Sequence, residues 1–146
     1  MIIKKLDIVK VGFTGTRKGM TDLQKEKIEF LLRQFEPTEF HHGDCFGSDE
    51  EAHEIAASLK IWTVVWAPIK KDFRSFSEGD DIKKPQSYLA RNRSIVDSCD
   101  LLLATPAEYV EQDRGGTWYT VRYAFKQNKA AIIILPDGTT KKYGMN

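Results

Sequence analysis

Short apolar segments alternate with amphipathic helical segments along almost the whole of this chain. The apolar segments are rich in β-branched and aromatic residues, and the segments between them repeat apolar side chains at helical spacing. This alternation is typical of an α/β fold with a mainly parallel sheet. The five predicted strands are Ile8–Phe13, Thr38–His42, Ile61–Ala67, Leu101–Thr105 and Ala130–Leu135.

Four helices are predicted between these strands. Thr21 and Gln24 have the spacing of a capping box at the start of the first helix, and Ser48 with Glu51 has the same spacing at the start of the second. Each start is followed by apolar residues that fall on one helical face. The two later helices are predicted over Tyr88–Ser98 and Thr117–Lys126.

Residues 69–87 interrupt this rhythm. They are densely charged and show no clear period, and a loop of this length in a compact domain is usually functional or mobile. After the fifth strand, Pro136-Asp137-Gly138 predicts a turn into a polar tail. No repeat, low-complexity tract or linker divides the chain, so residues 1–146 are predicted to form one domain.

Charge and cysteine content restrict the class of protein. The 22 Lys and Arg residues against 21 Asp and Glu leave a net charge of +1, which provides no global positive field for a nucleic acid or an anionic membrane. Cys45 and Cys99 are too few for a disulfide framework and lack the spacing of a zinc site. The start, MIIKKLDIVKVGF, has too short an apolar run for a signal peptide or an anchor. We expect a cytoplasmic protein without a metal, a cofactor or a membrane partner.

The turn after the first predicted strand has a composition suited to binding. In a parallel sheet, ligands bind beyond the carboxyl ends of the strands. Glycines there allow close backbone approach, and hydroxyls with a guanidinium suit a phosphate or a ribose diol. The alternative is an ordinary turn, which glycine and threonine also build. The candidate residues are Gly12, Thr14, Gly15, Thr16 and Arg17.

The turn after the second strand combines glycines with carboxylates. Gly43, Gly47 and Ser48 surround a predicted helix start, whose free N–H groups favour an anion. Asp44 and Asp49 would repel a phosphate at that place. They suit ribose hydroxyls or base N–H groups better, although Asp49 is equally explained as a first-turn helix charge.

Two further clusters carry arginines. Arg91 and Asn92, beside Arg93, are placed to clamp a phosphate, and the alternative is a solvated helix turn. The second cluster runs into the last helix and is a second candidate anion cradle. Its aromatic residue would stack on a base or pack in the core. The second cluster consists of Arg114, Gly115, Gly116, Thr117 and Trp118.

Taken in this order, the turns resemble the SLOG superfamily of Rossmann-like nucleotide-binding domains, which includes the "lonely guy" phosphoribohydrolases, DNA-processing protein A and the YspA/YpsA-related families. The resemblance runs from Gly12 to Pro136 and implies a three-layer domain with a mainly parallel five-stranded sheet in the order 3-2-1-4-5. It also implies a nucleotide or nucleotide-derived ligand across the strand ends. The residues that carry it are Gly12-Phe13-Thr14-Gly15-Thr16-Arg17, His42-Gly43-Asp44, Gly47-Ser48-Asp49 with Ala52, Arg91-Asn92 with Asp100, and Gly115-Gly116-Thr117.

The phosphoribohydrolases of this superfamily carry a proline-glycine-glycine-x-glycine-threonine-x-x-glutamate signature. Its glutamate works with an upstream arginine to cleave an N-glycosidic bond. Arg91 corresponds to that arginine by its spacing to Asp100 and Pro106, and Gly116-Thr117 matches the glycine-threonine pair. The glutamate position falls on Thr120, which departs from the signature.

An insertion over residues 107–114 offers other carboxylates. Glu108 and Glu111 lie in it, and Asp44 is a further candidate. In an enzyme of this type a carboxylate would stabilise an oxocarbenium-like transition state or act as nucleophile, and Arg91 would be its arginine partner. The candidate carboxylates are Glu108, Asp44, Asp49 and Glu111.

Three functions compete. The favoured one is a sensor or sequestering module for a nucleoside monophosphate or an ADP-ribose-like signal, because it needs only cradles, arginines and hydroxyl acceptors. The alternative is a nucleotide N-glycosidase or deoxyribosyltransferase. Single-strand nucleic-acid binding is least favoured, because the acidic residues within 69–87 cancel the field of their basic neighbours. The aromatic residues Tyr88, Tyr119, Tyr123 and Phe125 suggest a homodimer face or, alternatively, internal core.

Overall fold

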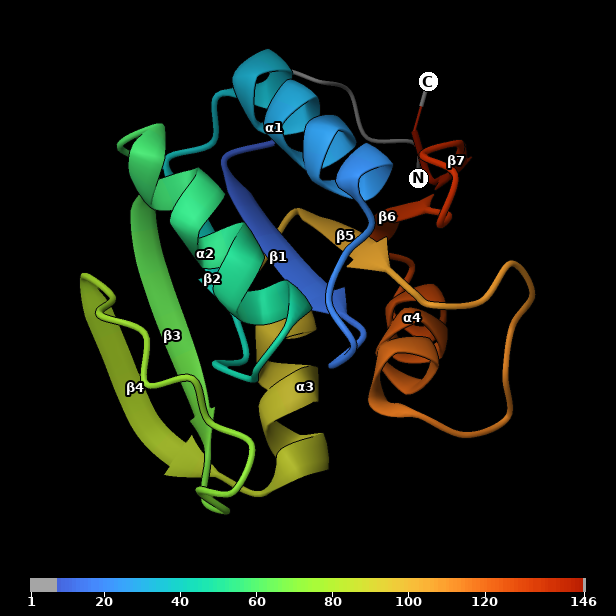
Figure 1. The fold of residues 1–146 in the computed structure, drawn as a ribbon. Helices are drawn as coiled ribbons and strands as arrows, with labels where there is room; N and C mark the ends of the chain where they lie inside the picture. The colour runs from blue at the N-terminus through green and yellow to red at the C-terminus, as the bar shows by residue number, and fades with distance from the viewer. Residues whose placement is uncertain (1–7, 146) are drawn as a thin grey trace.

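A seven-stranded sheet forms the middle layer of the molecule (Figure 1). The computed structural model describes residues 8–145, so residues 1–7 and Asn146 of the predicted domain lie outside the described part. The strand order is β4-β3-β2-β1-β5-β6-β7, and every neighbouring pair is parallel except β6 with β7. The strands are β1 Lys10–Gly15, β2 Glu39–His42, β3 Trp62–Pro68, β4 Asp81–Gln86, β5 Leu101–Thr105, β6 Ala130–Ile134 and β7 Thr140–Tyr143.

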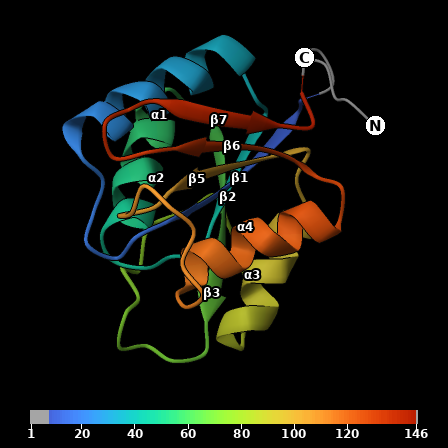
Figure 2. The ribbon, with the colours of Figure 1, turned by 90° about the vertical axis from the view of Figure 1, so that its right-hand side faces the viewer.

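Helices cover both faces of this sheet, and Figures 1 and 2 show the two helical layers from different sides. Apolar side chains of α1 and α2 pack with one face of the sheet, and those of α3 and α4 pack with the other. Within residues 8–145, no helix has the length and apolar character needed to cross a bilayer. The helices are α1 Asp22–Phe35, α2 Ser48–Ser58, α3 Tyr88–Asp97 and α4 Gly116–Lys126.

The five predicted strands are present in the predicted order, as β3-β2-β1-β5-β6, and all their pairings are parallel. The expectation of only five strands is wrong, because β4 lies within 69–87 and β7 lies in the polar tail. Both additional strands are at the sheet edges and are largely exposed, so they need no apolar alternation. Pro85 within β4 is tolerated because an edge strand pairs on one side only.

The predicted capping box of α1 is confirmed and extends further than its sequence pattern indicates. The Thr21 hydroxyl accepts a hydrogen bond from Gln24 N (3.1 Å), and Gln24 Oε1 accepts one from Thr21 N (3.0 Å). Gln24 Nε2 also donates to the carbonyl oxygens of Pro106 and Ile134, both at 2.9 Å. This buried amide therefore ties the start of α1 to the ends of β5 and β6.

The predicted capping box of α2 is wrong. The N-cap is Gly47, with φ 78°, and no side chain caps the helix. Ser48 Oγ instead donates to the carbonyl oxygen of Thr16 (2.6 Å), and Glu51 Oε1 accepts from Met20 N (2.7 Å). Both side chains hold the loop after β1, so tertiary contacts replace the local cap.

Replacing Gln24 by Leu should lower the free energy of unfolding by about 3 kcal/mol, because one N–H group and two carbonyl groups lose their partners in a buried site. Chemical denaturation measures this loss. Gln34→Leu is the matched control, because Gln34 is an exposed glutamine of the same helix. Equal stability of the two variants would contradict the assigned role of Gln24.

Candidate ligand site at the strand ends

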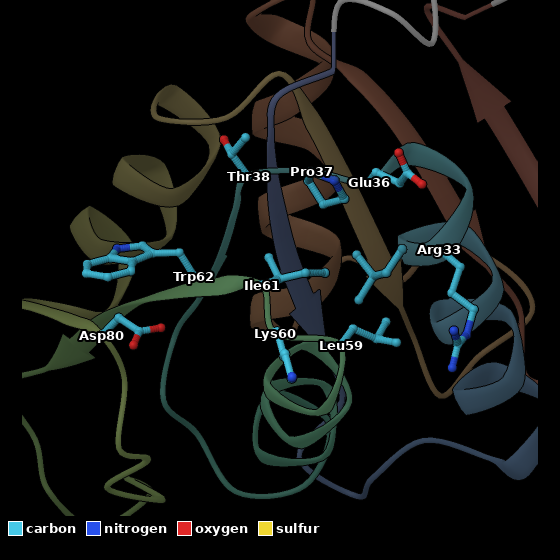
Figure 3. Close-up of a pocket in the computed structure, with 10 residues that line it drawn as sticks. Arg33, Glu36, Pro37, Thr38, Leu59, Lys60, Ile61, Trp62 and Asp80 are labelled. Carbon is cyan, nitrogen blue, oxygen red and sulfur yellow. The ribbon is translucent and has the colours of Figure 1, made fainter.

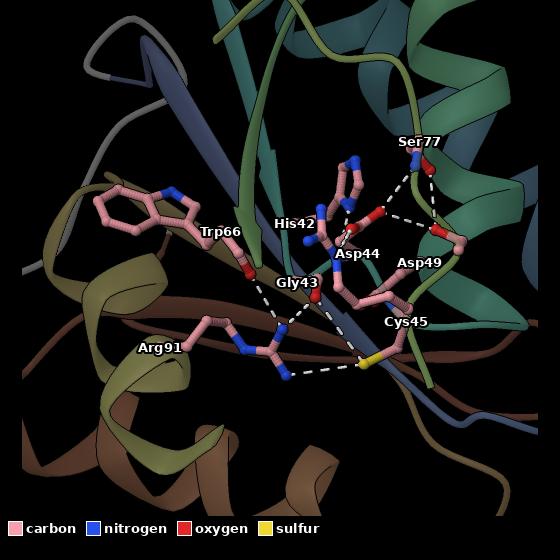
Figure 4. A network of polar contacts seen from close by, with 10 residues as sticks. His42, Gly43, Asp44, Cys45, Asp49, Trp66, Ser77 and Arg91 are labelled. Carbon is pink, nitrogen blue, oxygen red and sulfur yellow. Dashed lines mark hydrogen bonds and ion pairs between the residues drawn. The ribbon is translucent and has the colours of Figure 1, made fainter. Parts of the chain in front are cut away.

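Arg91 closes the β2–β3 side of the edge where the strands end (Figure 4). Only 2% of this residue is exposed. Its Nη1 donates to the carbonyl oxygens of Gly43 and Trp66, the latter at 3.0 Å, and its Nε donates to Asn92 Oδ1 at 2.8 Å. Its Nη2 lies 3.7 Å from Cys45 Sγ. The guanidinium thus joins α3 to the ends of two strands, with most of its donors used inside the protein.

Asp44 is fully buried beside this network and holds a segment that we call the strap, residues 69–80. Its Oδ2 accepts from Arg74 Nε (2.7 Å), and its Oδ1 accepts from Ser75 Oγ (2.9 Å) and Ser77 N (2.8 Å). Asp44 has φ 59°, in the left-handed region that aspartate tolerates better than most residues. Asp44 was predicted to accept hydrogen bonds from a ribose, but both of its carboxylate oxygens accept them from the strap.

Two more buried groups in this region have shifted pKa values. Asp44 N donates to His42 Nδ1 (3.0 Å), so that nitrogen is unprotonated and His42 Nε2–H donates to His53 Nδ1 (2.9 Å). Burial, aided by His53, lowers the pKa of His42 to about 3. Burial raises the pKa of Asp49 to about 6, although the nearby Arg91 charge opposes that rise.

The β1–β5 side of the same edge is open. A cavity of about 650 Å³ lies between the turn after β1, the insertion 107–114 and the start of α4. Tyr88 and Leu89 at the start of α3 complete its wall. The size is within the usual range of small-ligand sites, about 300–1,000 Å³.

The N-terminus of α4 opens into this cavity without a capping side chain. Its N-cap is Gly115, with φ 100°, and its first turn contains no acidic residue. Gly116 lets the Tyr88 side chain approach closely, since a Cβ there would lie 2.2 Å from the Tyr88 hydroxyl and would displace it. The first turn of α2, in contrast, carries three acidic residues. An anion is therefore favoured at α4 over α2.

Cationic side chains surround this helix start. Arg17, Lys18 and Arg114 line the cavity and are exposed, and none forms an ion pair with a carboxylate of residues 8–145. Glu108 lies in the same wall, where its Oε1 accepts from Trp118 Nε1 (2.8 Å). Asp113 and Arg122 line the cavity as well, and Arg122 pairs with Glu111 outside it. The cavity thus combines four cations with two carboxylates, of which Glu108 is held by a hydrogen bond.

The structure divides the predicted site residues into two groups. Glu108, predicted as catalytic, lies in the cavity wall, whereas Arg91 and Asp44 belong to the buried network. The predicted binding residues that line the cavity are Gly15, Thr16, Arg17, Arg114, Gly115, Gly116, Thr117 and Trp118. Those that do not line it are Gly12, Thr14, Gly43, Asp44, Gly47, Ser48, Asp49, Arg91, Asn92 and Pro106.

Close packing explains several glycines outside the cavity. A Cβ on Gly43 would lie 2.5 Å from Arg91 Nη1, and one on Gly47 would lie 2.3 Å from the Arg17 carbonyl oxygen. A Cβ on Gly12 would meet α3 at Ile95, 3.0 Å away. These glycines serve the approach of chain segments to one another.

Some residues of the cavity are not among the predicted site residues. Lys18 follows Arg17 in the same turn, and its position directly after the glycine-rich segment is a signal that sequence reasoning missed. Tyr88 and Tyr119, suggested as parts of a dimer face, also line the cavity. The Tyr119 hydroxyl additionally accepts from Arg93 Nη1 (2.9 Å).

A second cavity of similar size, about 690 Å³, lies at the opposite ends of the strands, where β2 and β3 begin (Figure 3). Arg33, Glu36, Lys60, Trp62 and Asp80 are among its lining residues. The C-terminal ends of α1 and α2 adjoin it, and helix C-termini disfavour an anion. The two cavities therefore differ in their suitability for an anion, because of the helix ends beside them, and not in volume.

No protein-family model and no curated protein matches the chain. Solved structures match its fold. A molybdenum cofactor binding protein from Rippkaea orientalis gives a TM-score of 0.68 at 20% identity, over 88% of this chain and 77% of that one. DNA processing protein A from Helicobacter pylori gives 0.62 at 24% identity, over 88% and 66%. The molybdenum cofactor carrier protein from Chlamydomonas reinhardtii gives 0.64 at 15% identity, over 95% and 78%.

These likenesses identify the architecture. The chain is a Rossmann-like α/β protein with a cavity at the carboxyl ends of its parallel strands, where ligands bind in folds of this class. More narrowly, it shares its fold with DNA processing protein A, one of the families that the sequence resemblance named.

The buried titratable groups predict opposing effects on stability. Since the pKa of His42 falls from 6.5 to about 3 on folding, protonation of the unfolded chain destabilises the protein as pH falls through this window. Since the pKa of Asp49 rises from 3.8 to about 6, Asp49 opposes that loss, because the folded state binds its proton first. Denaturation between pH 4 and 6.5 should show a flatter acid loss in His42→Gln and a steeper one in Asp49→Asn. Identical slopes in both variants and the unmodified protein would contradict these assignments.

Proposed function

We propose that the protein binds a phosphorylated nucleotide or nucleotide-derived ligand, with a phosphate at the start of α4. The observation that carries this proposal is the N-terminus of α4, which has no capping side chain and no acidic residue in its first turn. It opens into a cavity of about 650 Å³ lined by Arg17, Lys18 and Arg114, which form no ion pair within residues 8–145. Helix dipole and guanidinium charge favour the same kind of group at the same place. The ligand class includes nucleoside monophosphates and ADP-ribose-like molecules.

The rest of the cavity suits the sugar and the base. One oxygen of Glu108 accepts from Trp118, and its second oxygen is suited to accept a ribose hydroxyl. The Trp118 ring is only 5% exposed and packs in the core, so base stacking falls to the half-buried rings of Tyr88 and Tyr119. Binding by these contacts requires no catalytic step, so it is compatible with a sensor or a sequestering protein.

The structural neighbours support ligand binding in general. Two are a molybdenum cofactor binding protein and a carrier protein for the same cofactor, and a third is described by its single-stranded DNA binding mode. One fold therefore serves several ligands. The choice of a small phosphorylated ligand for this chain rests on its cavity and on the nearly neutral charge of the whole protein.

Isothermal titration calorimetry with AMP and ADP-ribose tests the proposal. Arg17→Ala and Arg114→Ala should each weaken binding about tenfold or more, because each removes one charge-assisted contact to phosphate. Lys60→Ala is the matched control, because Lys60 is an exposed cation at the opposite cavity. Failure of both nucleotides to bind, or an equal loss in the control, would contradict the proposed site.

Glu108 favours a second candidate function, cleavage of an N-glycosidic bond. Its carboxylate is held in the cavity wall by Trp118, where it could stabilise an oxocarbenium-like transition state. If the protein is such an enzyme, Glu108→Gln should abolish release of adenine from AMP while leaving AMP binding within about threefold. Glu111→Gln, which loses only a surface contact to Arg122, should retain activity. Chromatography measures released base, and tight binding without turnover in the unmodified protein would contradict the enzyme.

A further inference from the structure

The strap carries exposed aromatic residues at positions set by buried hydrogen bonds. Ser75 N donates to the Asp44 carbonyl oxygen (2.9 Å), and Phe46 N donates to the Phe73 carbonyl oxygen (3.0 Å). The Asp44 carboxylate holds the following residues from the other side (Figure 4). Phe73 is 43% exposed, yet its backbone is fixed against the turn after β2, where Arg74 forms an antiparallel bridge with Cys45.

The Phe73 ring contacts Arg17. The Arg17 Cζ atom lies 4.0 Å from the centroid of this ring and 5.2 Å from that of Tyr88, which belongs to α3. An exposed arginine loses much rotamer freedom when it binds a ligand, and contact with two rings limits that freedom beforehand. Stacking uses the face of a guanidinium and leaves its N–H edge available for an anion in the same plane.

A second arginine of the strap, Arg74, contacts both an aromatic ring and a carboxylate. The Arg74 Cζ atom lies 4.2 Å from the Phe76 ring centroid, while Arg74 Nε donates to Asp44 Oδ2 at 2.7 Å. Arg74 therefore combines a ring at its face with an anion at its edge. Arg17 Cζ likewise lies over a ring, and the Arg17 guanidinium has no carboxylate partner among residues 8–145.

We propose that Phe73 is a positioning residue that orients the Arg17 guanidinium at the mouth of the cavity, so that the Arg17 N–H edge binds the ligand phosphate. The strap, anchored on Asp44, thereby supports the ligand site through the contact of Phe73 with Arg17, although its own residues do not line the cavity. The effect on binding rests on the proposed function. The ordering of the Arg17 side chain by Phe73 does not depend on the proposed function.

The ligand-free protein provides the first test. Nuclear magnetic resonance relaxation of the Arg17 Nε–Hε group should show a rigid side chain, with a clear loss of order in Phe73→Leu and recovery in Phe73→Tyr, which keeps the ring. Phe30→Leu is the matched control, because Phe30 is a phenylalanine of similar exposure, 57%, beneath Lys27 on α1. An Arg17 side chain equally ordered in Phe73→Leu and the unmodified protein would overturn the proposal.

AMP binding provides the second test. Phe73→Leu should weaken AMP binding about fivefold, the cost of ordering one long side chain, whereas Phe73→Tyr should change it less than twofold. In an Arg17→Ala background, Phe73→Leu should have no further effect, which a purely structural role for Phe73 would not explain. Additive losses in this double-mutant cycle would overturn the proposal.

The two tests separate the possible failures. Absence of AMP and ADP-ribose binding to the unmodified protein would overturn the proposed function, and the Arg17 relaxation measurement would still decide the role of Phe73. AMP binding that depends on Arg17 and is unaffected by Phe73→Leu would overturn the role of Phe73 and leave the proposed function intact.

Discussion

A buried guanidinium determines how the carboxyl edge of the sheet is arranged. A charge taken out of water is tolerated only when its hydrogen-bonding groups find partners. Arg91 finds them in the backbone at the ends of β2 and β3, and this close approach requires glycine at position 43. The next residue, Asp44, takes a left-handed conformation and directs its carboxylate to the strap. The β2–β3 side of the edge is therefore a structural network.

The proposed ligand site is consequently on the β1–β5 side. There the start of α4 lacks a capping side chain and its first turn carries no acidic residue, and Arg17, Lys18 and Arg114 beside it form no ion pair within residues 8–145. The strap connects the two sides, because its anchor is in the buried network and its Phe73 ring contacts Arg17 at the cavity. The strap thus belongs to the buried network through its bonds to Asp44, and to the proposed binding site through Phe73.

The central fold could be predicted because its signals are local. Five apolar strands, their parallel order and the capping box at Thr21 all appear as short-range patterns or follow from the family resemblance. The edge strands β4 and β7 could not be recognised, since a polar strand that pairs on one side carries no apolar alternation. The prediction of a capping box at Ser48 was wrong because the Ser48 hydroxyl donates its hydrogen bond to the carbonyl oxygen of Thr16, 32 residues away.

The candidate site was predictable to a lesser degree. Small and cationic residues at strand ends indicated the edge at which the cavity lies, and the cluster at Arg114 to Trp118 lines that cavity. Sequence alone could not show that Arg91 and Asp44 are buried in a structural network, because a side chain's partners depend on which segments the fold brings together. The role of the strap was hidden for the same reason.

The central claim is that a nucleotide phosphate binds at the start of α4 and not in the equally large cavity at the opposite ends of the strands. The indole N–H signals of Trp118 and Trp62 report on these two places, because each residue lines one of the cavities. Titration with AMP, followed by ¹H–¹⁵N nuclear magnetic resonance, should shift the Trp118 signal and leave that of Trp62 in place. A saturable shift of Trp62 with an unmoved Trp118 would contradict the account.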